Sequence, residues 1–187
     1  MKYSKNMISK LKKITFIWHA IDILINSYMK LIGLCLNIIP GRPGNIYAKP
    51  LRIFFLRALG VKFGVKCQPS PGLFLYNLGR VEFGNNCSIG YNFKIWNFFN
   101  VKIGDNLLAS HSISIISATH DANEFSRTIP GEINIGNNVW IGANVVIVGP
   151  CNIGDNVIIG ANSYVKGVVE SNSIYAGNPA KYIRGMQ

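Results

Sequence analysis

An aliphatic residue recurs at every sixth position in the second half of this 187-residue chain. Four of the six members are followed by Gly, within a unit close to V-x-I-G-x-N. A period of six fits neither the 3.6-residue turn of an α-helix nor the two-residue alternation of a single strand. It predicts a solenoid in which each hexapeptide forms one short flat side and three sides form one coil. The members of this series are Ile135, Ile141, Ile147, Ile153, Ile159 and Val165.

The same period begins earlier in the chain. Phe83, Ile89 and Ile95 are also six apart, and after a slip of two residues the series resumes at Ile103. We expect each aliphatic side chain to point inward and to stack on its equivalent one coil away, at about the 4.8 Å spacing of neighbouring strands. Gly, Asn and Asp recur beside these positions, where tight corners need unusual backbone angles. A right-handed β-helix and a β-sandwich with fortuitous spacing are the alternatives.

The net charge of +11 is unevenly distributed. Residues 1–66 hold 12 Lys or Arg against one acid, Asp22, whereas the rest of the chain holds seven of each sign. The excess positive charge is therefore confined to residues 1–66. Because no other feature supports nucleic-acid binding, we expect no nucleic-acid partner. The four cysteines are scattered without a CxxC pair or metal-ligand spacing, which indicates buried thiols in a reducing compartment and no metal site.

Polar residues between Lys12 and Asn37 are three or four apart, which predicts an amphipathic helix with one narrow polar stripe that includes His19. Lysines and arginines lie on both sides of it, so we expect either contact with an anionic membrane surface or packing within the protein. A cleavable secretory signal is not indicated, and the protein is expected in the cytoplasm. It would lie at the inner face of the membrane if the first of these alternatives holds. We divide the chain into a helical segment at 1–66, a β-helix at 67–170 and a closing segment at 171–187.

The segment I-N-I-G-N-N-V-W-I-G-A-N-V-V-I-V-G-P-C-N-I-G-D-N-V-I-I-G-A-N-S resembles the hexapeptide-repeat acyltransferases, which are left-handed parallel β-helices. The tail S-I-Y-A-G-N-P-A-K-Y-I-R resembles the end of the maltose, galactoside and capsular-polysaccharide O-acetyltransferases. The resemblance implies an all-β, left-handed parallel β-helix. It also implies acetyl-CoA as co-substrate, a sugar hydroxyl as acceptor, and a homotrimer whose active sites lie between subunits.

The repeat is interrupted once on a large scale, by the loop at 116–132, and loops on a rigid scaffold often carry function. His120 lies near the start of this loop. An imidazole, with a pKa of about 6.5, accepts a proton at neutral pH and suits a general base for O-acetylation. In the resembling enzymes the histidine of the matching A-T-H segment is that base. Glu124 is our candidate for orienting His120, with Asp121 and Glu132 left open.

The resemblance also implies the binding residues. Trp140 matches a residue that lines the pantetheine channel, and Asn97 resembles an acceptor-binding asparagine, although Trp96 stands at the matching place. His111, in an S-H-x-x-I segment found in capsule-type members, is a second acceptor-side candidate. The remaining candidates contact coenzyme A: backbone at Gly142, Ala143, Gly160 and Ala161, and phosphate-binding cations at Lys166, Lys181 and Arg184.

The leading hypothesis is an acetyl-CoA-dependent O-acetyltransferase acting on a sugar of a bacterial surface polysaccharide, by direct attack without a covalent intermediate. One alternative is an N-acetyltransferase of an amino sugar nucleotide. The other is a noncatalytic β-helix that only binds.

Overall fold

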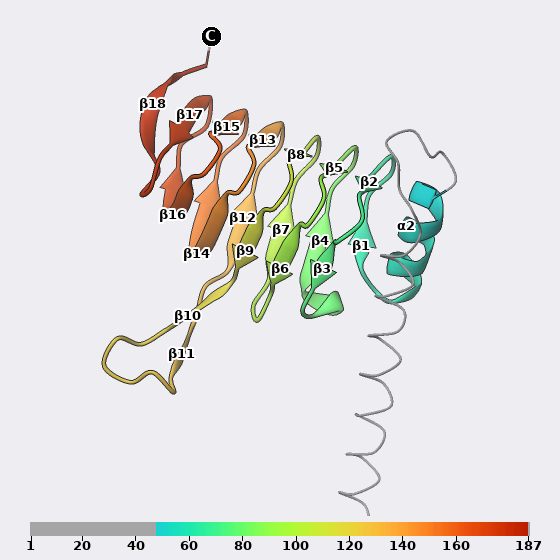
Figure 1. Cartoon of the computed structure of the whole chain (residues 1–187), viewed down its shortest axis with the longest axis horizontal. Coiled ribbons are helices and arrows are strands. Elements are labelled where there is room, and N and C mark those ends of the chain that lie inside the picture. Colours follow the sequence, from blue (N-terminus) through green and yellow to red (C-terminus); the bar gives the residue numbers. More distant parts are fainter. Residues whose placement is uncertain (1–47, 187) are drawn as a thin grey trace, which may run out of the picture. The chain divides into compact units, whose positions relative to one another are not determined.

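The computed structural model describes residues 48–186, with side chains from Arg52 onward (Figure 1). The predicted helix at 12–37, including His19, lies outside the described residues. One α-helix, α2 (Ala48–Ala58), precedes the strands. It packs on the first coil, where the guanidinium of Arg57 donates to the carbonyl oxygens of Phe63 (3.0 Å) and Gly64 (2.6 Å). In this part of the chain no helix is long and apolar enough to cross a membrane.

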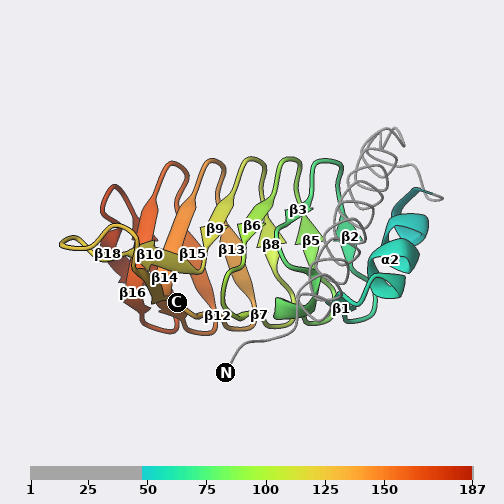
Figure 2. The same cartoon turned by 90° about the horizontal axis from the view of Figure 1, so that it is seen from below.

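The strands wind into a parallel β-solenoid of about six turns, and Figure 2 shows the coils following one another along one axis. The first side consists of β1 (Lys62–Phe63), β4 (Val81–Phe83), β7 (Val101–Ile103) and β12 (Ile133–Ile135). The second side consists of β2 (Gln68–Pro69), β5 (Ser88–Ile89), β8 (Leu108–Ala109), β13 (Val139–Ile141), β15 (Val157–Ile159) and β17 (Ser173–Ala176). The third side consists of β3 (Phe74–Leu75), β6 (Lys94–Trp96) and β9 (Ser114–Ile116).

Three elements depart from this simple order. The long strands β14 (Val146–Ile153) and β16 (Tyr164–Val169) each run from the third side around a corner into the first side of the next coil. The last strand, β18 (Lys181–Gly185), pairs antiparallel with β17 and closes the solenoid. A short 3-10 helix, η1 (Leu78–Arg80), and a hairpin of β10 (Ala118–His120) and β11 (Thr128–Pro130) occupy corners between the third and first sides.

Strand register explains the slip of two residues in the repeat. Equivalent residues in the first coils are 20 apart, as Asn86 and Asn106 are, whereas Asn138 and Asn156 are 18 apart. The two extra residues in each early coil lie at the corner that η1 occupies in the first coil. The solenoid begins at β1, so the first coil already includes residues before 67, the predicted start of the β-helix.

The core is the stack of inward side chains that the repeat predicts. All six members of the series from Ile135 to Val165 are at most 3% exposed. The earlier positions are buried as well, and the stacked rings of Phe63 and Phe83, 4.5 Å apart, close the core near α2. Burial of each of these side chains contributes about 1.5–3 kcal/mol relative to exposure. The predicted fold class, a left-handed parallel β-helix with an extruded loop, is confirmed.

Asparagines hold the corner between the first and second sides. Asn86, Asn106, Asn138, Asn156 and Asn172 stack there, one per coil, each with φ between +55° and +59°. Asn adopts this left-handed conformation at lower cost than most residues because its short polar side chain can hydrogen-bond locally. Each carboxamide donates to the next along the axis, over 2.8–3.0 Å. The recurring Asn of the repeat is thus explained by corner geometry together with a continuous hydrogen-bonded ladder.

Candidate active site

The β10–β11 hairpin leaves the solenoid between β9 and β12, in the predicted loop at 116–132 (Figure 1). Ser117, fully buried, anchors its base: the Ser117 hydroxyl accepts from the amide of Phe99 (2.8 Å) and donates to the carbonyl of Phe99 (2.9 Å). The returning chain bonds back, since the amide of Gly131 donates to the carbonyl of Ser117 (3.1 Å). The hairpin is therefore attached to the solenoid by a defined hydrogen-bond network.

Local bonds also order the hairpin tip. Asp121 accepts from the amide of Asn123 (2.8 Å) and lies 3.7 Å from the guanidinium of Arg127. The carboxylate of Glu124 accepts from the hydroxyl of Ser126 (3.2 Å). Both predicted acids thus have partners within the tip itself.

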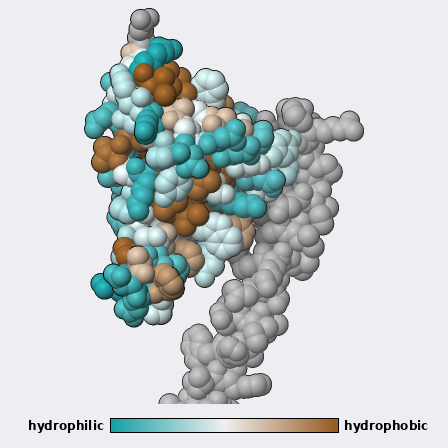
Figure 3. Space-filling model, turned by 60° about the vertical axis from the view of Figure 1, so that its left-hand side comes forward, coloured by the Kyte–Doolittle hydropathy of each residue, from teal (hydrophilic) through white to brown (hydrophobic). Residues whose placement is uncertain are grey.

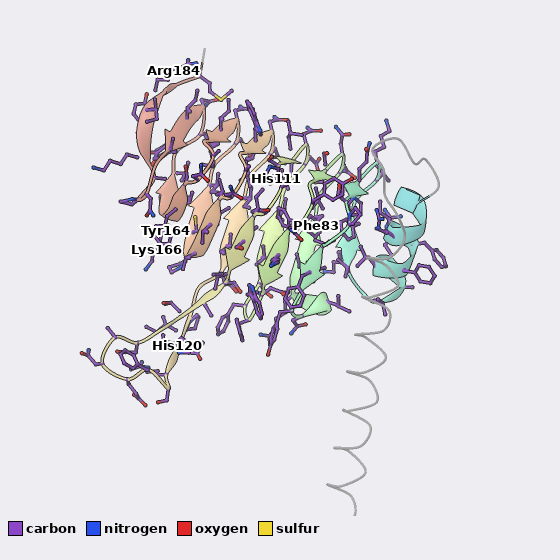
Figure 4. The ribbon with its side chains drawn as sticks, viewed as in Figure 1. Phe83, His111, His120, Tyr164, Lys166 and Arg184 are labelled. Carbon is purple, nitrogen blue, oxygen red and sulfur yellow. The ribbon has the colours of Figure 1, made fainter. Side chains whose placement is uncertain are left out.

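His120 ends β10, opposite Thr128, with its side chain exposed. Figure 4 shows it out on the hairpin, away from the body of the solenoid. Within residues 48–186 its imidazole forms no hydrogen bond, so nothing in the described chain holds it to Glu124, Asp121 or Glu132. That Glu124 orients it stays a prediction.

A corner lined by small residues runs between the second and third sides. Gly142, Ala143, Gly160 and Ala161 occupy equivalent places in consecutive coils, and we call them the small-residue corner. A Cβ on Gly142 would lie 2.6 Å from the amide nitrogen of Ala161, so coil stacking alone requires this glycine. Within the described chain the backbone N–H groups of Ala143 and Ala161 have no hydrogen-bond acceptor, which leaves two donors in adjacent coils for a ligand.

His111 lies at this same corner, one coil before Ala143. Its carbonyl accepts from the amide of Asn144 (3.1 Å), and its Nδ1 is 3.5 Å from the hydroxyl of Ser112. Figure 4 places it on the body of the solenoid, apart from His120. The two histidines therefore do not lie together within one chain.

The other predicted coenzyme A residues are spread over two sides of the solenoid. Trp140 projects from the second side, 50% exposed, between Leu108 and Ile158. Lys166 projects from the third side, whereas Lys181 and Arg184 lie exposed on β18. Figure 4 shows Lys166 and Arg184 on opposite edges of the last coils. Lys166 and Arg184 therefore do not converge within one chain.

Asn97 is fully buried at a corner between the third and first sides. Its carboxamide oxygen accepts from the amide of Asn77 (2.8 Å), and its nitrogen donates to the carbonyl of Asn77. In the single chain, Asn97 joins the first coil to the second. Its predicted contact with an acceptor stays a prediction.

Four outward-facing aromatic residues on the first two coils were given no role from the sequence, although Trp96 matches the place of the family's asparagine. They are Phe74, Tyr76, Trp96 and Phe98, each 38–54% exposed. The alternation of side chains along a strand could have revealed them. In F-L-Y and in W-N-F the middle residue points inward, so the two aromatic rings on either side of it lie on the outer face. Among residues 48–186, no three His, Cys, Asp or Glu side chains gather as a metal site.

The family model described as bacterial transferase hexapeptide (six repeats) matches residues 132–167. A probable macrolide acetyltransferase of Lysinibacillus sphaericus is 57% identical over 54 residues, which are 29% of this chain and 30% of that relative. The sequence match therefore spans less than a third of the relative's length.

Solved structures match over most of the chain, among them two acetyltransferases. A galactoside acetyltransferase in complex with coenzyme A superposes with a TM-score of 0.73 at 28% identity, covering 84% of this chain and 78% of that one. A maltose O-acetyltransferase from Clostridium difficile 630 superposes with a TM-score of 0.68 at 27% identity, covering 86% of each. In its hexapeptide period, its stacked coils and these matches, the chain is similar to the hexapeptide-repeat acetyltransferases.

Proposed function

We propose that this protein is an acetyltransferase that moves the acetyl group of acetyl-CoA to a hydroxyl of a sugar, in the synthesis of a bacterial surface polysaccharide. One observation carries the proposal. A solenoid that superposes on a galactoside acetyltransferase bound to coenzyme A is interrupted by one hairpin, and a histidine lies on that hairpin.

The small-residue corner supports coenzyme A as the donor. The pantetheine arm is long and carries amide groups, so it needs backbone donors on a surface without bulky side chains. Ala143 and Ala161 supply two such free amides one coil apart. Trp140 flanks the corner on the second side, and Lys166, Lys181 or Arg184 would bind the phosphates.

The chemistry requires one base. His120 takes the proton from the acceptor hydroxyl while that oxygen attacks the thioester carbonyl. A carbon–oxygen bond forms, the carbon–sulfur bond breaks, and the proton passes from His120 to the departing sulfur. The buried thiols do not compete as nucleophiles, because burial raises the pKa of Cys87 and Cys151 to about 12.

Assembly into a homotrimer would complete the site. The hairpin and the small-residue corner lie at opposite edges of the third side, so one chain does not bring His120 to its own corner. In the trimer that we propose, the hairpin of one subunit reaches the corner of its neighbour. We further propose that the protein is cytoplasmic, with peripheral contact to the inner face of the membrane through its basic segment.

A thiol-release assay tests the function. Acetyl-CoA is incubated with the protein and with free sugars, nucleotide sugars or lipid-linked oligosaccharides, and released coenzyme A is measured. We expect acceptor-dependent release, with an ester on the sugar that mild base removes. An amide product would instead identify an N-acetyltransferase, and absence of both release and coenzyme A binding would support the noncatalytic alternative.

A further inference from the structure

Four aromatic rings form a continuous row on the outer face of the first two coils. The ring of Trp96 lies 4.9 Å from that of Phe74 and 5.9 Å from that of Tyr76, and Tyr76 lies 4.7 Å from Phe98. We call Phe74, Tyr76, Trp96 and Phe98 the aromatic platform. Figure 3 shows hydrophobic surface divided into separate patches by hydrophilic atoms on the face from which the hairpin projects.

The core does not explain these rings. The inward positions of the same strands are filled by Leu75 and Ile95, and the coils further along carry smaller outward residues at equivalent places, such as Ser114 and Val146. Aromatic side chains exposed together are unfavourable in water, and such patches commonly mark binding surfaces. The platform is therefore best explained by a ligand.

Two cations flank the platform. Lys94 lies beside Phe74 on the outer face of the third side, and the guanidinium of Arg80 donates to the carbonyl of Phe98. Neither side chain forms an ion pair with the described residues. Two acids of these coils have other partners: Glu82 pairs with Lys62 on the first side, and Glu132 accepts from Asn100. The surroundings of the rings thus favour an anionic ligand.

The platform is continuous with the base of the hairpin. Ser117, which begins the hairpin, bonds to the backbone of Phe99, next to Phe98, and its amide donates to the carbonyl of Trp96 (3.1 Å). A ligand lying along the rings would extend toward the hairpin that carries His120. A row of four rings is also longer than one sugar unit, whose apolar C–H face covers about one ring.

We propose that the aromatic platform, with Lys94 and Arg80, binds an anionic oligosaccharide, so that the acceptor is an extended acidic saccharide rather than a free neutral sugar. The acceptor role rests on the function proposed above. A twofold contact between copies fits the surface less well, because it would bring Lys94 and Arg80 near their own equivalents. A heterologous contact, such as that of the proposed trimer, is distinguished by the oligomeric state of Trp96→Ala.

Binding to the full-length protein is measured by calorimetry with three probes: an oligogalacturonate of several units, monomeric galacturonate and a neutral malto-oligosaccharide. We expect the oligogalacturonate to bind at least about tenfold more tightly than the other two. Trp96→Ala should weaken its binding about tenfold through lost stacking. Lys94→Gln should weaken it a fewfold and reduce its salt dependence. Phe54→Ala, which removes an exposed ring from α2, is the control and should change nothing.

Equal affinity for all three probes, or Trp96→Ala and Lys94→Gln both binding as the wild type does, would overturn the inference. A change in oligomeric state with Trp96→Ala, measured by ultracentrifugation, would overturn it in favour of an interface between copies. The two proposals fail separately. Oligogalacturonate binding that depends on Trp96, without thiol release from acetyl-CoA, would support the platform and count against the acetyltransferase.

Discussion

The side chain of Asn106 donates a hydrogen bond to that of Asn138 over 2.8 Å, although 32 residues separate them in the chain. The hairpin separates these two asparagines in the sequence, yet the coils that contain them are hydrogen-bonded to each other in the same way as other neighbouring coils. Val101 and Ile103 likewise pair in register with Ile133 and Ile135. The hairpin is therefore an addition to a corner, and the solenoid continues unchanged beneath it.

Removal of the hairpin should spare the fold. Deleting residues 118–131 joins Ser117 to Glu132, so two residues remain at the corner. The next coil has a corner of the same length, with Gly149 and Pro150 between Val148 and Cys151. We expect a cooperative unfolding transition and a circular dichroism spectrum like those of the full chain. Turnover should fall at least about 100-fold because the base is lost. A molten or aggregated product would show that the hairpin is part of the core.

The asparagine ladder should contribute measurably to stability. Asn138→Ala removes two hydrogen bonds and places a Cβ-bearing residue at φ +55° without local compensation, so the free energy of unfolding should drop by about 1–3 kcal/mol. Asn138→Gly loses the same bonds but tolerates the backbone angle, and should lose less. Urea unfolding of both variants measures which one loses more free energy of unfolding. Equal losses would show that backbone strain makes no contribution.

Neighbouring residues in β5 test the inward and outward assignment of the repeat. Ile89 is fully buried, whereas Ser88 is exposed. We expect Ile89→Ala to lower the free energy of unfolding by roughly 2–5 kcal/mol through a cavity in the stack. Ser88→Ala should change it by less than about 0.5 kcal/mol. Comparable effects of the two substitutions in chemical denaturation would contradict the register.

The buried thiols predict a loss of stability in alkali. Burial raises the pKa of Cys87 and Cys151 to about 12, above the value of about 8.5 for a free thiol. Their contribution to stability is thus fully present below about pH 8.5 and is lost as the pH rises toward 12, because the unfolded chain ionises first. The urea midpoint should fall over this range. At about pH 8, iodoacetamide should label both thiols in urea but not in the folded protein, and rapid labelling of the folded chain would contradict their burial.

Much of the fold could be predicted because its information is local and periodic. The six-residue spacing determines which side chains point inward, so it predicts Ile141 and Ile147 in the core, where both are fully buried. The left-handedness of the solenoid could be predicted only from the family resemblance, because parallel crossovers are otherwise nearly always right-handed. The slip of two residues was visible in the sequence, but its cause, a longer corner in each early coil, became clear only from strand register.

The site was less predictable because it depends on contacts between distant segments. The sequence placed His120 on a loop, but not at the end of a strand opposite Thr128. The resemblance implies that Asn97 contacts the acceptor, but its hydrogen bonds to Asn77 arise only because the next coil, 20 residues away, stacks on it. The aromatic platform was missed since Phe74 and Trp96 meet only when the coils stack.

Replacement of His120 tests the central claim most directly. Turnover and acetyl-CoA affinity are measured on His120→Ala and on His111→Ala, with an acceptor found by thiol release. We expect His120→Ala to reduce kcat by about 100-fold to 10,000-fold while the Kd for acetyl-CoA stays within about twofold. His111→Ala, at the corner, should retain a much larger share of kcat. A His120→Ala protein with near wild-type kcat would contradict the assignment of His120 as the base.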